Sequence, residues 1–459
     1  MAAGGAVFRS RRTEHILCDE EMGMDRQPEQ NMTGREAGLT RRKVLRYALS
    51  GLGIAAGAGA AAMYLKRAAD PVAADVLEVF RNDAPTGQLW EDWKRRGWVA
   101  PVRYYLKLGR NVQCKTCPHE CILSPGDRGR CRNRVNVDGT LYTLAYGNPC
   151  AYNLDPIEKK PLYHFLPGTR IFSLSTTGCA FRCLNCQNWD TSQRKPEELK
   201  DPRGQDVRAS VQILRRIFSG EGELGERMSM FPEDVVAIAE ELRSPSIACT
   251  YTEPTAYFEY ALDIARAARA RRLRNVWVTC GYTASRPLEE LCQYLDAANV
   301  DLKSFSEQTY RKLNQGKLQP ILDTLRTMKR LGVWVEVSYL VVPTYADDMD
   351  GIRRMCRWIM DNMGPDHPLH FLRFHPAHRL TQLPPTPLET MQEARQIAIQ
   401  TGLRYVYLGN VRQVAGCDTT VCPGCGAKVI EREIWIVREN RLKDGRCGSC
   451  GTRIAGVWA

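Results

Sequence analysis

Short apolar runs alternate with amphipathic segments through the second half of the chain. The runs have strand length and cover residues 171–176, 246–252, 275–281, 300–303, 333–342, 369–374 and 404–408. Helical periodicity separates them at 232–243, 255–271, 287–297, 321–331, 349–363 and 387–401. This alternation predicts parallel strands joined by right-handed helical crossovers. Six or seven such units predict an α/β fold, a full or partial (βα) barrel rather than an open sheet.

The remaining segments differ from this core in pattern. Residues 1–40 are polar without periodicity, which predicts a disordered tail. We expect a leader at 41–68, a linker at 69–107, a Cys-rich module at 108–166, the core at 167–412 and a Cys-rich tail at 413–459. Residues 196–230 are a charged insertion, too irregular to form a core unit.

The leader pairs Arg41 and Arg42 with nineteen uncharged residues, 47–65, eleven of which are Gly or Ala. This is just long enough for a transmembrane helix and resembles a twin-arginine signal, which predicts export or membrane association through 47–65. A retained anchor is the alternative, and a buried soluble helix is a third interpretation. Basic residues are denser before the run, which favours an internal N-terminus and an external body.

Composition narrows the function classes. With 44% hydrophobic and 25% charged residues among 459, the chain is not a disordered or fibrous protein. Its net charge of +12 is spread along the chain, so nucleic-acid binding is not expected. Eighteen cysteines include three tight groups, whose spacing indicates metal thiolates rather than disulfides.

The central group carries the clearest chemistry. Cys179, Cys183 and Cys186 follow the first strand at C-x3-C-x2-C spacing. Three cysteine ligands leave one iron of a [4Fe–4S] cube open, and S-adenosylmethionine (SAM) can bind that iron. Structural zinc takes four ligands, and no fourth Cys or His lies close in the sequence. The spacing therefore predicts a cluster that cleaves SAM reductively to a 5′-deoxyadenosyl radical.

Several ordered motifs accompany this loop. They are 114–121 (CKTCPHEC), 155–164 (DPIEKKPLYH), 187–189 (QNW), 251–255 (YTEPT), 300–305 (VDLKSF), 370–376 (HFLRFHP), 405–410 (YVYLGN) and the terminal cysteine pairs. Over about 108–458 the chain resembles the radical SAM enzyme of the AmmeMemoRadiSam system, which is similar to pyruvate formate-lyase activating enzyme. The resemblance implies a partial (βα) TIM-type barrel, the radical SAM core. The chain departs from common radical SAM patterns at Ala180, Asn185 and Cys280.

Polar residues at strand ends are the candidate SAM ligands, since chemistry in such barrels sits at the C-terminal ends of the strands. By position Thr252 and Glu253 would hold the SAM ammonium, with a helix-capping Glu as the alternative. Asp301 and Lys303 share one strand face and either line the barrel mouth or form an internal salt bridge.

Arg373 and His375 share a face of the strand at 369–374. Arg373 could bind the SAM carboxylate or the substrate, and His375 could transfer a proton or donate a hydrogen bond. Structural hydrogen bonds at a strand end are the alternative for both residues.

Two further cysteine groups flank the core. The C-terminal spacing, C-x2-C-x21-C-x2-C, predicts a zinc ribbon, with a rubredoxin-like iron second; its ligands are Cys422, Cys425, Cys447 and Cys450. The N-terminal group binds zinc, the favoured metal, or an auxiliary Fe–S cluster, with His119 able to replace one ligand; it comprises Cys114, Cys117, Cys121 and Cys131. Cys249, Cys280, Cys292 and Cys356 lie in apolar patterns and are expected to be core thiols.

The sequence therefore predicts a radical SAM enzyme with a [4Fe–4S] cluster, SAM and zinc. The substrate would be a protein glycine, as in activating enzymes, or a small metabolite, and flavodoxin or ferredoxin would be the reductant. The alternative function is a non-catalytic, membrane-tethered zinc-binding protein that contacts a partner or nucleic acid.

Overall fold

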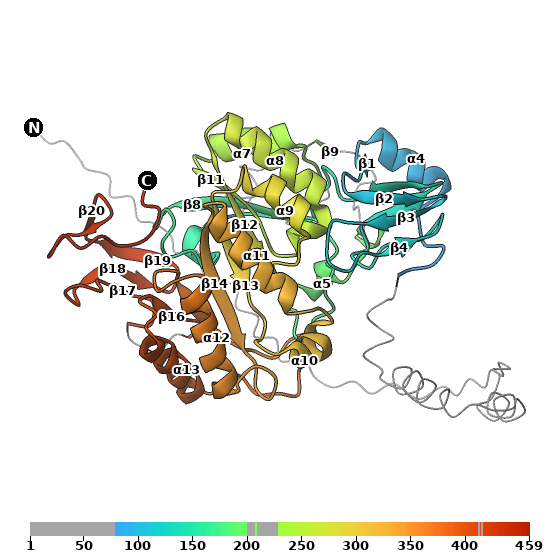
Figure 1. Cartoon of the computed structure of the whole chain (residues 1–459). Coiled ribbons are helices and arrows are strands. Elements are labelled where there is room, and N and C mark those ends of the chain that lie inside the picture. Colours follow the sequence, from blue (N-terminus) through green and yellow to red (C-terminus); the bar gives the residue numbers. More distant parts are fainter. Residues whose placement is uncertain (1–78, 200–206, 209–227, 412–413, 415) are drawn as a thin grey trace, which may run out of the picture. The chain divides into compact units, whose positions relative to one another are not determined.

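A mixed sheet of eight strands forms the centre of the fold (Figure 1). The computed structural model describes residues 79–199, 207–208, 228–411, 414 and 416–459. The strand order is β16-β15-β14-β13-β12-β11-β8-β7. The strands are β7 (Ala151–Pro156), β8 (Arg170–Ser175), β11 (Ser246–Cys249), β12 (Arg274–Thr279), β13 (Ala297–Asp301), β14 (Trp334–Val341), β15 (Leu369–Arg373) and β16 (Val406–Gly409).

From β8 to β16 all neighbours are parallel, and each predicted apolar run overlaps one of these strands. Their side chains are buried almost without a break, for example over β11, as is typical of parallel strands. Since β16 and β7 are the two edges of the order, the sheet is open rather than a closed barrel. The prediction of an α/β fold is confirmed, the full barrel is wrong, and the partial barrel stays a prediction.

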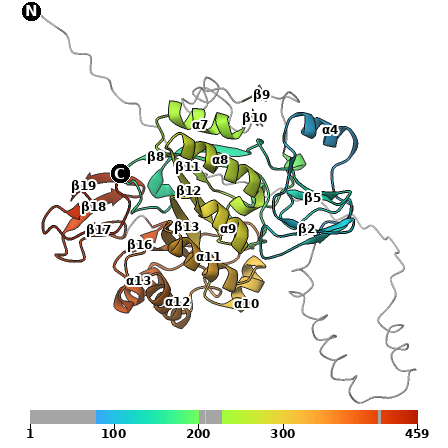
Figure 2. The same ribbon diagram turned by 45° about the horizontal axis from the view of Figure 1, so that its top comes forward.

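Helices between consecutive parallel strands cover the sheet. They are α7 (Pro232–Glu241), α8 (Phe258–Ala270), α9 (Ser285–Cys292), α11 (Gln319–Arg330), α12 (Met349–Asn362) and α13 (Leu388–Thr401). Figures 1 and 2 show them following one another along the sheet. Shorter turns lie in the connections: η1 (Ile157–Lys159), α5 (Trp189–Ser192), η2 (Pro196–Glu198), η3 (Pro254–Tyr257), α10 (Glu307–Thr309) and η4 (Tyr310–Asn314).

Strand β7 was missed by the apolar pattern. It pairs antiparallel with β8 and forms an edge of the sheet, so Asn153 and Asp155 alternate with the apolar Tyr152 and Leu154. The carboxylate of Asp155 forms a buried ion pair with Lys160, which explains a charged residue at this position. An edge strand with these residues does not produce the continuous apolar run of a central strand.

Two small three-stranded sheets, β1-β6-β5 and β2-β3-β4, form an N-terminal module. Its elements are α4 (Gly87–Arg95), β1 (Ala100–Pro101), β2 (Tyr105–Leu108), β3 (Asn111–Cys114), β4 (Ile122–Leu123), β5 (Arg134–Val137) and β6 (Thr140–Thr143). We expected residues 69–107 to form a linker. The described part of this range instead contains α4, β1 and most of β2. Trp93 and Trp98 pack with Val135 and Leu144 of the module and bury that segment.

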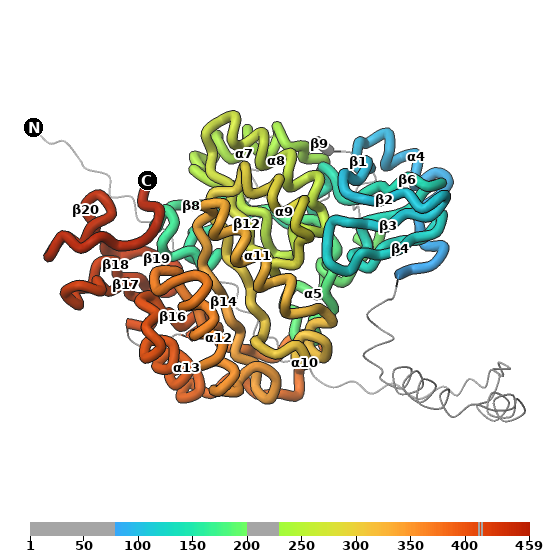
Figure 3. Tube along the Cα trace, in the orientation of Figure 1, coloured from blue at the N-terminus to red at the C-terminus, as the bar shows by residue number. Residues whose placement is uncertain are grey.

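The C-terminal tail follows β16 as β17 (Thr420–Val421), β18 (Lys428–Glu433), β19 (Ile436–Asn440), β20 (Leu442–Lys443) and β21 (Arg446–Cys447) (Figure 3). It packs through Val429 and Ile454 against Tyr163, Tyr405 and Tyr407 of the core. The tail therefore shares a hydrophobic cluster with the sheet.

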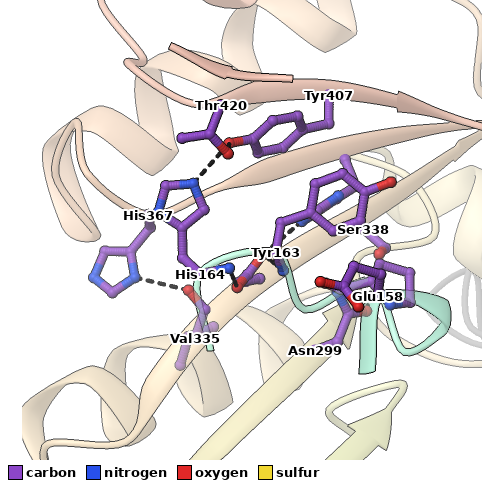
Figure 4. A network of polar contacts seen from close by, with 12 residues as sticks. Glu158, Tyr163, His164, Asn299, Val335, Ser338, His367, Tyr407 and Thr420 are labelled. Carbon is purple, nitrogen blue, oxygen red and sulfur yellow. Dashed lines mark hydrogen bonds and ion pairs between the residues drawn. The ribbon is translucent and has the colours of Figure 1, made fainter. Parts of the chain in front are cut away.

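A buried polar network reinforces this packing (Figure 4). Both oxygens of Glu336 accept hydrogen bonds, from the backbone N–H groups of Tyr163 (2.9 Å) and His164 (2.7 Å). The ring of His164 contacts the carbonyl of Ala455 (2.6 Å) and the hydroxyl of Tyr407 (2.6 Å). Part of the 155–164 motif thus fixes the tail to the core.

The predictions of a membrane and a transmembrane helix need correction. Within the ranges that the structure describes, no helix is both long and apolar enough to cross a bilayer. Residues 47–65, on which the prediction was made, lie outside the described residues, as do the expected tail at 1–40 and the leader at 41–68. Of the insertion at 196–230, the structure describes η2 and a parallel pair, β9 (Val207–Arg208) and β10 (Met228–Ser229).

Candidate functional site

The central cysteines lie on the loop that leaves the C-terminal end of β8. Cys179 and Cys183 are buried and Cys186 is half-buried. Burial raises the pKa of Cys183 to about 11, and it also raises the pKa of Cys179. Burial therefore favours the protonated form of these thiols, whereas metal ligation requires thiolates.

Hydrogen-bond donors face the sulfurs. The backbone N–H of Phe181 donates to Sγ of Cys179 (3.4 Å), and Nδ2 of Asn314 donates to Sγ of Cys183 (3.2 Å). The hydroxyl of Ser192 lies 3.2 Å from Sγ of Cys186. Donors in these positions stabilise sulfur that carries negative charge. Asn314 comes from η4, far along the sequence, and no local sequence pattern predicted it.

Glu253 caps the turn after β11. Its Oε1 accepts hydrogen bonds from the Thr255 backbone N–H (3.1 Å), the Thr255 hydroxyl (2.8 Å) and the Thr279 hydroxyl (2.8 Å). Its Oε2 accepts from the backbone N–H of Cys280 (2.7 Å). The neighbouring Thr252 hydroxyl donates to the carbonyl of Thr176 (2.9 Å), which ties this turn to the cysteine loop. The capping interpretation of Glu253 matches these contacts, and its contact with SAM stays a prediction.

Asp301 ends β13, Lys303 follows it at the same edge of the sheet, and the two form a salt bridge of 2.8 Å. The ammonium of Lys303 lies close enough to Cys183 and Cys280 to lower the pKa of both thiols, although burial raises each of them more strongly. Burial opposes the charge of Lys303 itself, but Asp301, Cys280 and Cys183 together outweigh burial and raise the Lys303 pKa. Cys280, expected to be a core thiol, is a half-buried member of this site; its position at the end of β12 is the signal that could have revealed it.

Arg373 and His375 stand where β15 ends. Nε of Arg373 donates to the carbonyl of Thr386 (2.7 Å), which closes the loop after β15, and His375 is exposed. That loop reaches the cysteine loop, since the N–H of Arg379 donates to the carbonyl of Leu184 (2.9 Å). The structure thus brings the loop of Arg373 and His375 to the cysteine loop, and direct contacts of these two side chains with SAM stay predictions.

The N-terminal cysteines gather around one cavity. Cys114 ends β3, and its N–H donates to the carbonyl of Cys121 (2.9 Å) across the β3–β4 hairpin. Cys117 and Cys131 line the same cavity from the adjoining loops. His119 lines it too, but its Nε2 lies 3.1 Å from the carbonyl of Ala180, so the ring already has a hydrogen-bond partner.

The C-terminal cysteines form a tight group. All four ligand sulfurs lie within 4.8 Å of one another, with Cys422 and Cys450 3.6 Å apart and Cys425 and Cys447 3.7 Å apart. The N–H of Gly424 donates to Sγ of Cys422 (3.4 Å), as expected of a knuckle turn. A tetrahedral ion with metal–sulfur bonds of about 2.3 Å separates its ligand sulfurs by about 3.8 Å. The predicted cluster of four cysteines is confirmed, and its geometry suits one ion.

Sequence comparison identifies the core. Residues 173–358 match the Radical SAM superfamily. An uncharacterized protein of Methanocaldococcus jannaschii is 42% identical over 354 residues, which cover 76% of this chain and 97% of that protein. The chain belongs to the radical SAM superfamily. Its radical SAM core includes the Cys179 loop and extends from β8 into α12.

More distant relatives are activating enzymes. The pyruvate formate-lyase 1-activating enzyme of Escherichia coli K12 is 22% identical over 257 residues, 52% of this chain and 93% of that protein. Among solved structures, a domain of a pyruvate-formate lyase-activating enzyme from Bacteroides vulgatus covers 36% of this chain and 99% of its own, at 18% identity and a TM-score of 0.31. The superfamily assignment rests on the sequence matches.

The superfamily implies a [4Fe–4S] cluster and SAM, and the residues of this loop fit them. Three thiols share one loop, two of them receive hydrogen bonds, and Lys303 places a positive charge beside Cys183. In addition, Oδ1 of the buried Asn185, next to Cys186, has no hydrogen-bond partner among the described residues. Such an orphaned acceptor beside the cysteines is available to a bound ligand.

Proposed function

We propose that this chain is a radical SAM enzyme that cleaves SAM reductively and starts hydrogen abstraction from a substrate. The observation that carries the proposal is the placement of Cys179, Cys183 and Cys186 on one loop at the C-terminal edge of the parallel strands. Cys179, Cys183 and Cys186 would hold a [4Fe–4S] cluster, which would supply one electron to break the C5′–S bond of SAM, giving methionine and a 5′-deoxyadenosyl radical. The chain's own residues hold, orient and shield the reactants.

Each polar residue of the site has a proposed role. Phe181 N–H and the Asn314 amide stabilise the ligand sulfurs, and Lys303, anchored by Asp301, keeps a cation at the C-terminal edge of the parallel strands. That cation attracts the carboxylate of SAM. Glu253 acts by positioning, because its oxygens already accept four hydrogen bonds that fix the strand ends.

The remaining strand-end residues extend this site. Thr252 positions the turn through its bond to Thr176. Arg373, at the end of β15, offers a half-buried guanidinium to SAM or the substrate, and the exposed His375 donates a hydrogen bond or moves a proton at the rim.

The proposed substrate class is a partner protein, from which the radical removes a glycine hydrogen, with flavodoxin or ferredoxin as the reductant. Two observations support it: relatives that carry the name activating enzyme, and the motif set that resembles the AmmeMemoRadiSam radical SAM enzyme. A small metabolite is the alternative substrate. We also propose zinc for the C-terminal cysteines, where it would stabilise a tail too small for its own core.

The test is an anaerobic assay of 5′-deoxyadenosine with SAM and dithionite. We expect the reconstituted wild-type protein to form it, Cys183→Ala to form none, and Cys356→Ala to match the wild type. Cys356 is a matched control because it is also buried but lies in α12, away from the loop. A reconstituted wild type without product, or equal product from Cys183→Ala, would refute the proposal.

A further inference from the structure

The cavity among the N-terminal cysteines belongs to no part of the SAM site. It is lined by the β3–β4 hairpin and by the loop that carries Cys131. Thr255 and Ala256, from the turn that follows Glu253, complete the lining. Cys114 and Cys131 are buried and the other two thiols are half-buried. None of the four forms a disulfide, and four thiols that line one cavity are a ligand set suited to a metal centre.

The distances between the sulfur atoms differ between the N-terminal and the C-terminal group of four cysteines. Among the described residues, the C-terminal group alone has three or more potential ligand atoms all within 4.8 Å of one another. The N-terminal sulfurs are therefore more widely spread than those around a single tetrahedral ion, which need about 3.8 Å. In a [4Fe–4S] cluster each thiolate binds a different iron. The cysteine sulfurs therefore lie farther apart than four sulfurs that bind one zinc ion.

The charges around the cavity favour an anionic group. Arg130 and Arg134 are buried and both line it. Arg134 is paired with Glu259 (3.0 Å), and Arg130 donates to the carbonyl of Ala180 (3.2 Å) and to Oε1 of Gln315 (2.5 Å). A cluster held by four thiolates carries net negative charge, which these two buried guanidinium groups attract.

The cavity also adjoins the SAM site. Ala180, directly after the ligand Cys179, lines it and accepts hydrogen bonds from His119 and Arg130. Gly178 lies against the carbonyl of Cys131, so closely that an added Cβ would be 2.4 Å from that oxygen. The loops of the two cysteine groups are therefore in direct contact.

We propose that Cys114, Cys117, Cys121 and Cys131 hold a second iron–sulfur cluster, closed by four thiolates and placed beside the SAM-binding loop. Four protein ligands leave no open iron, so this cluster does not bind SAM. The proposal goes beyond the proposed function and does not depend on SAM cleavage.

The test removes the SAM cluster and asks whether iron and sulfide remain. The full chain with Cys179→Ala, Cys183→Ala and Cys186→Ala is reconstituted anaerobically, and its iron, acid-labile sulfide and zinc are counted. We expect iron and sulfide in about equal amounts, visible thiolate-to-iron absorption, and about one zinc. Adding Cys117→Ala should abolish the iron and sulfide, whereas adding Cys292→Ala, a buried thiol in α9, should not.

Two zinc ions without iron, iron without sulfide, or no metal beyond one zinc would overturn the proposal. Should the triple variant fail to fold, the wild-type count decides. Iron and sulfide clearly above about four per chain support a second cluster, whereas about four irons and two zincs overturn it. Because the triple variant cannot bind the SAM cluster, its result is independent of whether the wild type forms 5′-deoxyadenosine.

Discussion

Gly178→Ala tests the contact between the two cysteine loops. Gly178 has φ of +87°, which costs an alanine about 1–2 kcal/mol. The added Cβ would also lie 2.4 Å from the carbonyl oxygen of Cys131 and 2.7 Å from Oδ1 of Asn133. Forced overpacking of this kind costs about 1–3 kcal/mol more. The expected total is about 2–5 kcal/mol of unfolding free energy, with loss of iron from both loops.

Gly109→Ala is the matched control. Gly109 has φ of +68°, but nothing lies within 4 Å of its added Cβ. It should therefore cost only the conformational part, about 1–2 kcal/mol, and leave the iron content unchanged. Denaturant unfolding and iron analysis of both variants measure the difference. Equal stability and equal iron in the two variants would refute the contact.

The other predictions concern separate parts of the molecule. Asn314→Ala removes a hydrogen bond to Cys183 Sγ, so the cluster's midpoint potential should fall in a redox titration while iron content stays constant; an unchanged potential would contradict this. His164 is buried, and burial lowers its pKa to about 4, so the unfolded chain, with a pKa of about 6.5, binds more protons at pH 5. The contribution of His164 to stability should thus fall by about 2 kcal/mol from pH 7 to pH 5, so in denaturant titrations His164→Gln should lose about 2 kcal/mol less over this range than the wild type. Cys450→Ser should remove about one zinc per chain and expose the tail to proteolysis while SAM cleavage persists; retained zinc would argue against the ribbon.

How far the sequence predicts this structure depends on whether the signal is local. The parallel strands were predictable because burial on both faces gives continuous apolar runs, as in β14, and helices such as α12 begin at a clear cap, Asp348. Strand β7 was not predictable in this way, because it is an edge strand and its polar residues interrupt the apolar run. The segment that contains Trp93 looked like a linker because its partners, Val135 and Leu144, lie far along the chain.

In the candidate site, too, local sequence signals predicted some features, whereas contacts between distant loops were missed. The ligand cysteines and the strand-end positions of Glu253 and Lys303 were predictable from spacing and topology. Asn314 and the approach of Cys280 to Lys303 were not, because both depend on how loops from different crossovers meet. The capping contacts of Glu253 likewise depend on the end of the neighbouring strand β12.

The most direct test of the central claim is electron paramagnetic resonance of the reduced cluster before and after SAM is added. An iron without a protein ligand binds SAM directly, which changes the spectrum of the reduced cluster. We predict this change in the wild type and in Cys356→Ala, and no such SAM-responsive signal in Cys183→Ala. A wild-type protein that holds a reduced cluster whose spectrum does not respond to SAM would contradict the account.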